Sequence, residues 1–578
     1  MTSERSIKII KLIVKNFRGI GPTGLVIDID DVVVLVGPNN SGKSTILKAF
    51  QLVTSSSDTK IKIDDFYNKI ESNKPEIEVW SKVLLPDSVT IASDKWINDD
   101  GVVKEKWLWE KPEESATRIG FRVDLDGGRW AVSTDEPKAP FSNDGAATAY
   151  RPSPTYISPF DQPEKQVEEI KKIISSDIYD LIKKTKKDDP KYIKLIEEIS
   201  KLQEEIKQEA SVKENELAIG IGAILNELFS GTTISLYVPQ NSPDLLSSYA
   251  TTKDIDFKIN DLSLENQGSG MQRMLLWSVL KMLAGRKKIE TKTKKAVNKK
   301  TTFVAGLDVI EEIQPERSKV LLMDEPEICL HPESIRQAKE ILYSLSSGNE
   351  WQIMITTHSP VFIDLSKDNT NIIRVQKEDE AVSLFQTNEA GLSEDEKEQV
   401  KMLNIFDPYF AEFFFSKNTI IVEGDTEYTA FRKIIEADKV KYKDIHIIRA
   451  RGKYTILPII KILKKWGKNF SVLHDSDEEN NTQSWPANQK ILDLVANDVK
   501  IRLVATKKNF ETAFFAQEVE KDKPYNAYIE VGKPDILFKV SKLLDYLSNI
   551  DAVLHVDICD CVCEYKTIEE LKNFLQSP

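Results

Sequence analysis

The chain has little cysteine, and its cysteines do not form a recognisable metal-binding pattern. Four occur among 578 residues. Cys329 stands alone, whereas Cys559, Cys561 and Cys563 alternate in a Cys-Asp-Cys-Val-Cys stretch. The alternation predicts that these three lie on one side of a β-strand, and no fourth ligand with zinc-site spacing lies nearby. We therefore expect reduced thiols and a cytoplasmic protein.

The chain also has no long hydrophobic run and no excess of positive charge. No apolar segment approaches the roughly 20 residues that a membrane-spanning helix needs, and the first residues do not form the apolar core of a signal peptide. We expect no contact with a membrane. The net charge of −13 argues against a surface that attracts DNA everywhere, so any nucleic-acid contact must come from local basic patches. The length predicts roughly two to four domains.

A glycine-rich loop between a buried strand and a helix is the first motif that carries chemistry. Residues 32–36 are all Val or Leu, and residues 46–53 have a helical pattern. In such a strand–loop–helix unit the backbone N–H groups surround the β-phosphate, Lys43 reaches the β and γ oxygens, and Ser44 holds Mg²⁺. The residues expected to bind the nucleotide are Gly37, Asn40, Gly42, Lys43, Ser44 and Thr45.

A second buried strand, within residues 320–327, ends in adjacent acids. We expect Asp324 to hold the Mg²⁺ of ATP and Glu325 to polarise the attacking water. The next strand leads to His358, which is in a position to reach the γ-phosphate. Upstream, Ser269 and Gly270 open a helix, where backbone donors and the helix dipole favour a phosphate.

The segments between these motifs leave alternatives open. Residues 164–229 read as two charged amphipathic helices, either an arm that mediates dimerisation or a layer packed on its own domain. Seven lysines between 287 and 300 form either solvated surface or a contact with the DNA backbone. Five tryptophans between 80 and 130 favour core and hairpin packing over base stacking.

Acidic residues follow two predicted strands in the final third of the chain. The apolar run 419–422 leads to Glu423, a glycine turns the chain, and Glu427 follows on the first turn of a helix. The run 470–474 leads to Asp475 and Asp477. Sites in open α/β sheets lie at the carboxyl ends of the strands, and converging carboxylates bind divalent cations that activate water and stabilise a leaving phosphate oxygen. The pattern therefore predicts a metal site.

These motifs resemble two known domains in one chain. Residues 1 to about 415 resemble an ABC-type ATPase of the SMC/RecF branch, although Gly268-Ser269-Gly270 departs from the usual Leu-Ser-Gly-Gly form. Residues 416 to about 535 resemble a Toprim domain through Glu423-Gly424-x-x-Glu427, Gly452-Lys453 and Asp475-x-Asp477. The fusion resembles the OLD (overcoming lysogenization defect) family of bacterial and phage-associated DNases, several of which act in phage defence, including as retron effectors.

The resemblance implies an α/β protein with an ABC-type ATPase head, a helical insertion and a Toprim domain. The implied segments are 1–163 and 230–415 for the head, 164–229 for the insertion, 416–535 for Toprim and 536–578 for a C-terminal segment packed on Toprim. It implies a head dimer in which Ser269 and Gly270 complete a partner's ATP site. The residues implied to hold Mg²⁺ or Mn²⁺ are Glu423, Glu427, Asp475, Asp477 and Glu511, and Lys533 is the candidate that stabilises the scissile phosphate.

The function implied is an ATP-driven, metal-dependent DNA endonuclease of anti-phage defence. Its implied partners are DNA, further copies of the chain in a dimer or tetramer, and a companion protein such as a helicase or a reverse transcriptase with its DNA product. One alternative is a DNA-clamping scaffold ATPase with an inactive Toprim domain. The other is a topoisomerase or primase, for whose additional domains the sequence after residue 535 leaves no room. The activating trigger stays open.

Overall fold

In the computed structural model the described residues fall into two compact units. One contains residues 1–33 and 42–357, and the other contains residues 34–41 and 358–578. The residues that the structure describes are 7–55, 60–84, 93–125, 127–132, 135, 138–140, 151–158, 220, 223, 234–237, 256–259, 262–263, 268, 270–282, 318–328, 330–347, 351–365, 367–378, 381–407, 410–467, 469–478, 481–495, 498–516 and 521–577.

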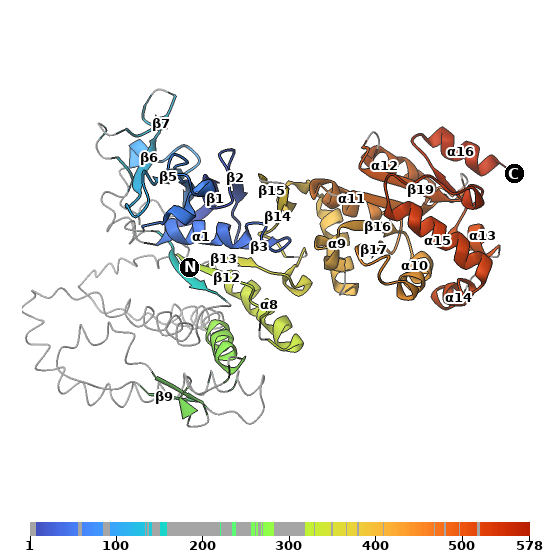
Figure 1. The fold of residues 1–578 in the computed structure, drawn as a ribbon, viewed down its shortest axis with the longest axis horizontal. Helices are drawn as coiled ribbons and strands as arrows, with labels where there is room; N and C mark the ends of the chain where they lie inside the picture. Colours follow the sequence, from blue (N-terminus) through green and yellow to red (C-terminus); the bar gives the residue numbers. More distant parts are fainter. Residues whose placement is uncertain are drawn as a thin grey trace, which may run out of the picture. The chain divides into compact units, whose positions relative to one another are not determined.

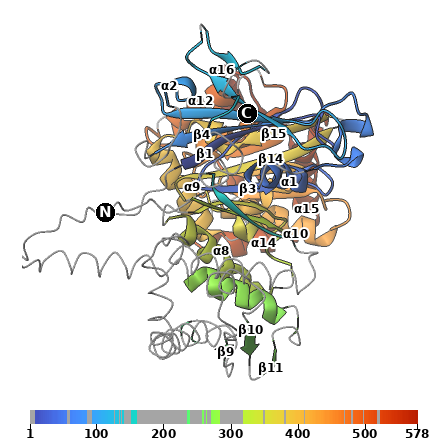
Figure 2. The same cartoon turned by 90° about the vertical axis from the view of Figure 1, so that its left-hand side faces the viewer.

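The first unit opens with an antiparallel sheet in the order β2-β1-β4-β5-β6-β7. Its strands are β1 (Ile7–Lys15), β2 (Leu25–Asp28), β4 (Glu76–Val83), β5 (Val102–Leu108), β6 (Thr117–Arg122) and β7 (Arg129–Trp130). β1 pairs with β2 and, on its other side, with β4. Figure 2 shows β1 beside β4. Alternate residues of β1 and β5 are buried, which is the pattern of a sheet with one covered face.

The tryptophans of this region pack as predicted. Trp96, Trp107 and Trp109 are at most 2% exposed. Trp80 and Trp130 lie on the sheet under lysine side chains, with the Nζ of Lys104 at 3.9 Å from the Trp80 ring centroid and the Nζ of Lys106 at 4.6 Å from that of Trp130. The aromatic rings therefore serve the core and the sheet surface of this unit.

Parallel strands carry the second half of the first unit. β12 (Lys319–Asp324) pairs in parallel with β13 (Trp351–Thr356) and with β8 (Ser153–Ile157). The helices α1 (Lys43–Thr54) and α8 (Pro332–Ser346) pack against these strands (Figure 1). β12 and β13 are buried along most of their length, which is typical of parallel strands covered on both faces. β3 (Val32–Val36) is fully buried, and the boundary between the units runs through it.

The second unit contains a hairpin and a mostly parallel sheet. The hairpin joins β14 (Thr370–Glu378) and β15 (Ala381–Gln386), and α9 (Glu394–Phe406) follows. The sheet has the order β17-β16-β18-β19-β20. Its strands are β16 (Asn418–Val422), β17 (Ile445–Arg449), β18 (Phe470–Asp475), β19 (Ile501–Thr506) and the antiparallel β20 (Val562–Glu564).

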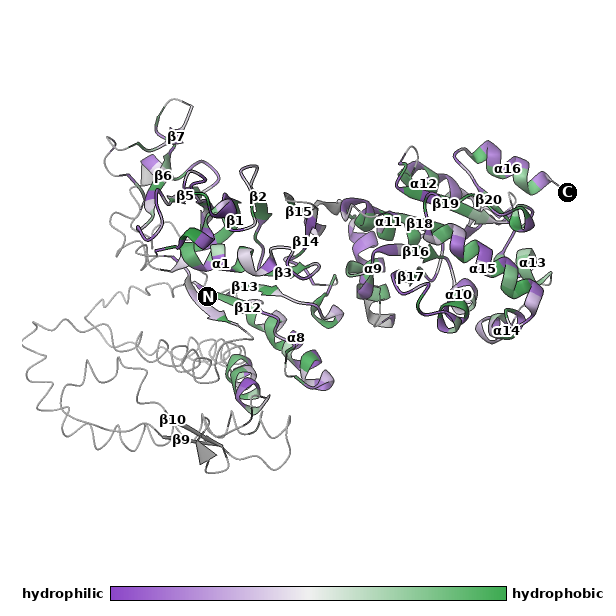
Figure 3. Ribbon diagram, in the orientation of Figure 1, coloured by the Kyte–Doolittle hydropathy of each residue, from purple (hydrophilic) through white to green (hydrophobic). Residues whose placement is uncertain are grey.

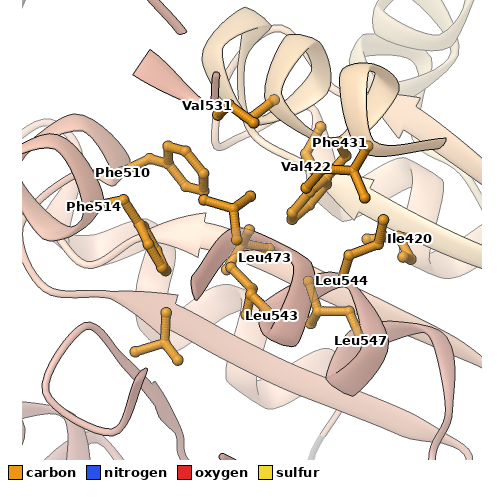
Figure 4. Close-up of a cluster of buried hydrophobic side chains, with 14 of the residues drawn as sticks. Ile420, Val422, Phe431, Leu473, Phe510, Phe514, Val531, Leu543, Leu544 and Leu547 are labelled. Atoms are coloured by element: carbon orange, nitrogen blue, oxygen red, sulfur yellow. The ribbon is translucent and has the colours of Figure 1, made fainter. Parts of the chain in front are cut away.

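Helices cover this sheet and bury its core. They are α10 (Asp425–Ala437), α11 (Ile456–Lys465), α12 (Trp485–Val495), α13 (Phe510–Phe515), α14 (Lys523–Glu530), α15 (Pro534–Ser548) and α16 (Ile568–Gln576). Hydrophobic colour follows β16 and β18 in Figure 3. Figure 4 shows side chains such as Phe431, Leu473 and Leu544 packed between the sheet and its helices. α15 supplies several of these buried residues, so this helix packs on the sheet.

The cysteine prediction is wrong in part. Of the three alternating cysteines, Cys563 lies in a strand, whereas Cys559 and Cys561 belong to the turn that begins at the 3₁₀ helix Val556–Ile558. The backbone N–H of Cys561 donates to the carbonyl of Ile558 at 3.0 Å, so local turn hydrogen bonds replace a strand ladder there. The three thiols consequently differ in exposure: Cys561 is buried, Cys563 is half-buried and Cys559 is exposed.

Several predicted features fall outside the described residues. They include nearly all of the insertion at 164–229, the lysine-rich stretch 287–300, Ser269 and Cys329. Within the part of the chain that the structure describes, no helix is long and apolar enough to cross a membrane.

Candidate functional site

The loop after β3 has the backbone that a phosphate-binding loop needs. Gly37, Asn40 and Gly42 have φ angles of 148°, 62° and 107°. A Cβ atom on Gly37 would lie 2.1 Å from the carbonyl oxygen of Val375, so only glycine fits at this position. α1 begins at Lys43 with Gly42 as its N-cap, which directs the free N–H groups of its first turn toward the loop. The predicted strand–loop–helix unit is confirmed.

The acids at the end of β12 lie next to this helix. The hydroxyl of Ser44 donates to Oδ1 of Asp324 at 3.1 Å, and the hydroxyl of Thr356 donates to the same oxygen. Burial lowers the pKa of Lys43, although the charges of Glu325 and Asp324 oppose that shift. The lysine, the hydroxyl and the acids expected to handle ATP are thus brought together within the first unit.

Glu325 stands in a strained backbone conformation with φ 49°. Its N–H donates to the carbonyl oxygen of Thr356 at 3.0 Å and to the hydroxyl of Thr356 at 3.1 Å. These bonds join the end of β12 to the end of β13. They hold the backbone of Glu325, and with it the Cα atom from which the side chain extends, in one position.

The structure describes His358 and Gly270, but Ser269 lies outside the described residues. His358 is exposed, belongs to the second unit, and its ring centroid lies 6.5 Å from that of Phe415. Gly268 and Gly270 flank Ser269, and the carbonyl oxygen of Gly268 accepts from the N–H of Met271 at 2.9 Å. This bond begins the helix 270–282, as the sequence predicts.

The second set of acids gathers at the carboxyl ends of β16 and β18. Glu423 directly follows β16, Asp475 ends β18, and the N–H of Asp475 donates to Oε2 of Glu423 at 3.1 Å. One carboxylate oxygen of Asp475 also accepts from the hydroxyl of Thr506 at 2.8 Å and from the N–H of Phe510 at 3.0 Å. The parallel pairing of β16, β18 and β19 places these groups at one edge of the sheet.

Two further acids are buried beside this pair. Glu427, on the first turn of α10, is 3% exposed, and Glu511, on the first turn of α13, is 4% exposed. Glu511 accepts a hydrogen bond of 2.8 Å from the hydroxyl of Thr426. We call Glu423, Glu427, Asp475, Asp477 and Glu511 the acidic cluster.

Burial and mutual repulsion make the charged form of the cluster costly. Burial raises the pKa of Asp475 to about 8, and the charge of Glu423 adds to this shift. Burial likewise raises the pKa of Glu427 well above its ordinary value, with the charges of Asp475, Glu423 and Glu511 adding to it. The pKa of Glu423 is also raised by burial. Such carboxylates need a cation to be stable in their charged form.

Lysine ammonium groups supply part of this compensation. Lys453, whose side chain is 3% exposed, pairs with Asp477. Lys523 lies 3.1 Å from Oε1 of Glu511. As the side chains lie, no three acidic, histidine or cysteine side chains of the described residues are arranged to hold a metal ion directly. The acids lie close together, but Asp477 and Glu511 are each paired with a lysine.

The cluster nevertheless suits a divalent cation. It offers carboxylate oxygens, the donors that Mg²⁺ and Mn²⁺ bind, and its buried acids resist ionisation without a compensating charge. Sequence reasoning missed Lys523, Thr426 and Thr506, because nothing in their local pattern marks them. Lys453 stood in the motif Gly452-Lys453, and its pairing with Asp477 gives that motif a physical role.

Lys533 lies at the N-cap of α15, and its Nζ contacts Oε1 and Oε2 of Glu530 at 2.7 and 2.6 Å. Among the described lysines, Lys453 and Lys523 are the ones whose ammonium groups pair with acids of the cluster. The role of Lys533 stays a prediction.

Below the cluster, His474 is fully buried in β18. Its ring nitrogens lie 2.8 Å from the carbonyl oxygen of Asp475 and 2.8 Å from the hydroxyl of Tyr565. Burial lowers the pKa of His474 to about 3, so the ring is neutral. This histidine braces the strand end and adds no charge to the site.

Family models match both parts of the chain. A family model described as AAA ATPase domain matches residues 7–129 and 152–363. A second model, described as the TOPRIM domain of overcoming lysogenization defect protein-like proteins, matches residues 414–477.

Among curated proteins, the chain is 23% identical over 494 residues to the Old nuclease of Escherichia phage P2, covering 82% of this chain and 78% of that protein. It is 24% identical over 244 residues to the OLD nuclease of Thermus scotoductus, covering 38% of this chain and 46% of that protein.

Among solved structures, an Smc head bound to the C-terminal winged-helix domain of ScpA aligns with a TM-score of 0.41 and 16% identity, covering 67% of this chain and 98% of that chain. The recombination mediator RecF with ATP aligns with a TM-score of 0.34 and 14% identity, covering 66% of this chain and 99% of that chain. Because the ATPase model matches more than half of the chain, the chain belongs to the AAA ATPase domain family, and residues 414–477 carry the TOPRIM domain of the overcoming lysogenization defect family.

Proposed function

We propose that this protein is an ATP-dependent DNA endonuclease whose acidic cluster binds Mg²⁺ or Mn²⁺. The observation that carries the proposal is the gathering of five carboxylates at the carboxyl edge of one sheet. The loop before α1 also has the backbone that a phosphate-binding loop needs. The two curated relatives are both named as nucleases.

The metal's contribution would be to orient a water molecule and to neutralise the phosphate oxygens as the bond breaks. Glu423 and Asp475 would bind it first, because each is fixed by hydrogen bonds at the end of its strand. Asp477, Glu427 and Glu511 would complete the donor set once the lysine partners of Asp477 and Glu511 move away. Lys453 and Lys523 would then be free to contact the phosphate, a role that we also keep for Lys533.

The ATPase part would control this site. Lys43, Ser44 and Asp324 would hold Mg²⁺ and the ATP phosphates, and Glu325 would activate the water that attacks the γ-phosphate. His358 would sense that phosphate, and Ser269 and Gly270 would complete the ATP site of a second copy in a dimer or tetramer. We further propose a role in defence against phage, triggered by a companion such as a helicase or a reverse transcriptase with its DNA product.

Plasmid nicking tests the central proposal. The wild-type protein should convert supercoiled DNA to nicked or linear DNA with Mg²⁺ or Mn²⁺, and EDTA should stop the reaction. Glu423→Gln and Asp475→Asn should abolish nicking and leave ATP turnover unchanged. Glu436→Gln is a matched control, since Glu436 is an exposed residue of α10 that pairs with Lys439. Nicking that survives either cluster variant would refute the proposal.

One observation favours a second candidate, a scaffold ATPase that binds DNA without cutting it. The pairing of Lys453 with Asp477 resembles a site whose cation position has been filled by a lysine. A scaffold would bind DNA equally well in EDTA and would cleave it under no metal condition. Nicking that depends on Mn²⁺ and stops with EDTA excludes it.

A further inference from the structure

A pocket of about 500 Å³ lies in the second unit beside the acidic cluster. Pockets that hold small organic groups have volumes of about 300–1,000 Å³, so this one is large enough for a nucleotide. Its lining comes from the segment after β18, the segment from β19 into α13, the turn before β20, and α16. The charged and hydroxyl residues that line it are Glu478, Lys507, Lys508, Thr512, Asp560 and Lys572.

The pocket and the acidic cluster share backbone. Glu478 directly follows Asp477, and Thr512 directly follows Glu511. The N–H of Asp477 donates to the carbonyl oxygen of Lys508 at 3.1 Å, and the N–H of Lys508 donates to the hydroxyl of Ser476 at 3.0 Å. The two segments that carry Asp477 and Glu511 therefore also carry pocket residues.

The lysines give the pocket a surplus of positive charge. Three ammonium groups face two carboxylates, in a chain whose net charge is −13. The Nζ of Lys508 lies 3.0 Å from Oε1 of Glu478, and that of Lys507 donates to the carbonyl oxygen of Ser577 at 2.6 Å. Positive charge beside a cluster of acids lets an anionic strand approach a site that would otherwise repel it.

We propose that this pocket binds the nucleotide that adjoins the scissile phosphate of a DNA strand. Lys508 and Lys572, which both line the pocket, contact its phosphate oxygens. The inference rests on the proposed nuclease function, because it takes the acidic cluster as the place of cleavage. The pocket would add a second contact, which sets the direction in which the DNA strand leaves the acidic cluster.

Strand binding without cleavage tests this inference. A fluorescein-labelled single-stranded oligonucleotide is titrated with the full chain in EDTA, and its anisotropy gives the Kd. Lys572→Gln should raise the Kd by about tenfold, and each lost phosphate contact should reduce the slope of log affinity against log salt by about 0.7.

Lys417→Gln is the matched control, since Lys417 is an exposed lysine of the same unit that pairs with Asp444. A wild-type Kd for Lys572→Gln, in a protein with an unchanged melting temperature, would overturn the inference. An equal effect of Lys417→Gln would overturn it too, because binding would then follow net charge alone. If the wild-type protein nicks plasmid DNA while the pocket variant binds normally, only this inference fails. If it nicks under no metal condition, the proposed function fails instead.

Discussion

The backbone N–H of Asp475 donates a hydrogen bond of 3.1 Å to Oε2 of Glu423. This bond joins the ends of two neighbouring parallel strands, β16 and β18. It holds the carboxylate of Glu423 against the backbone of Asp475. Both side chains are therefore constrained before any cation arrives. The cost of holding them together is electrostatic, so it depends on pH and on the lysines nearby.

The stability of the metal-free protein should depend on pH through Asp475. Its pKa is about 8 when folded, against an ordinary value of 3.8. The folded state therefore holds a proton that the unfolded state releases, and the resulting stabilisation is lost as the pH rises toward about 8. In EDTA, the melting temperature of the wild-type protein should fall between pH 5 and about 8.5 more steeply than that of Asp475→Asn.

Added Mg²⁺ should raise the melting temperature more at the upper end of this range, because the ionised carboxylate binds the metal. Asp438→Asn, a substitution outside the acidic cluster, should keep the wild-type slope. Equal slopes for wild-type and Asp475→Asn would show that this carboxyl group is not responsible.

Removal of the Lys453 ammonium group should destabilise the metal-free protein. Lys453→Met leaves Asp477 without its buried partner, which costs about 1–3 kcal/mol of unfolding free energy for a partly exposed acid. The double variant Lys453→Met/Asp477→Asn should recover most of this loss, because neither charge remains. Chemical denaturation of the four proteins in EDTA measures the coupling. Additive effects would mean that the pair contributes nothing.

Glu325→Gln should stop ATP hydrolysis without preventing ATP binding. The amide has nearly the shape of the carboxylate but cannot polarise the attacking water, so turnover should fall by about 100-fold or more. Phosphate release measures turnover, and a fluorescent ATP analogue measures binding. Glu333→Gln, on the exposed start of α8, is the control. ATP turnover that is unchanged in Glu325→Gln would assign the water-activating role to another residue.

Gly37→Ala should disrupt the ATP-binding loop. The added methyl group would meet the carbonyl oxygen of Val375 at 2.1 Å, and the φ of 148° is itself unfavourable for any other residue. We expect a cost of more than about 2 kcal/mol and a loss of ATP binding. Gly19→Ala is the control, because a Cβ there meets nothing within 4 Å. A soluble Gly37→Ala protein with normal ATP affinity would contradict this account.

Much of both sites could be predicted from short stretches of the chain. The run Val32–Val36 before the glycine-rich loop, and the apolar runs before Asp324, Glu423 and Asp475, identify the strands and the functional residues at their carboxyl ends. These features depend on local backbone geometry and on the burial of apolar residues, which act within a few neighbouring positions. Parallel strands then place their carboxyl ends at one edge, so the acids were expected to lie close together.

Only the tertiary structure decided which charges meet. Lys453 pairs with Asp477, Lys523 contacts Glu511, and Lys533 contacts Glu530 instead of the acidic cluster. Such pairs depend on how strands and helices pack, and a lysine side chain long enough to reach several acids leaves no local pattern to choose among them. The sequence alone therefore determined the types of chemistry present, and packing decided their partners, because contacts across a fold are made by side chains that are distant along the chain.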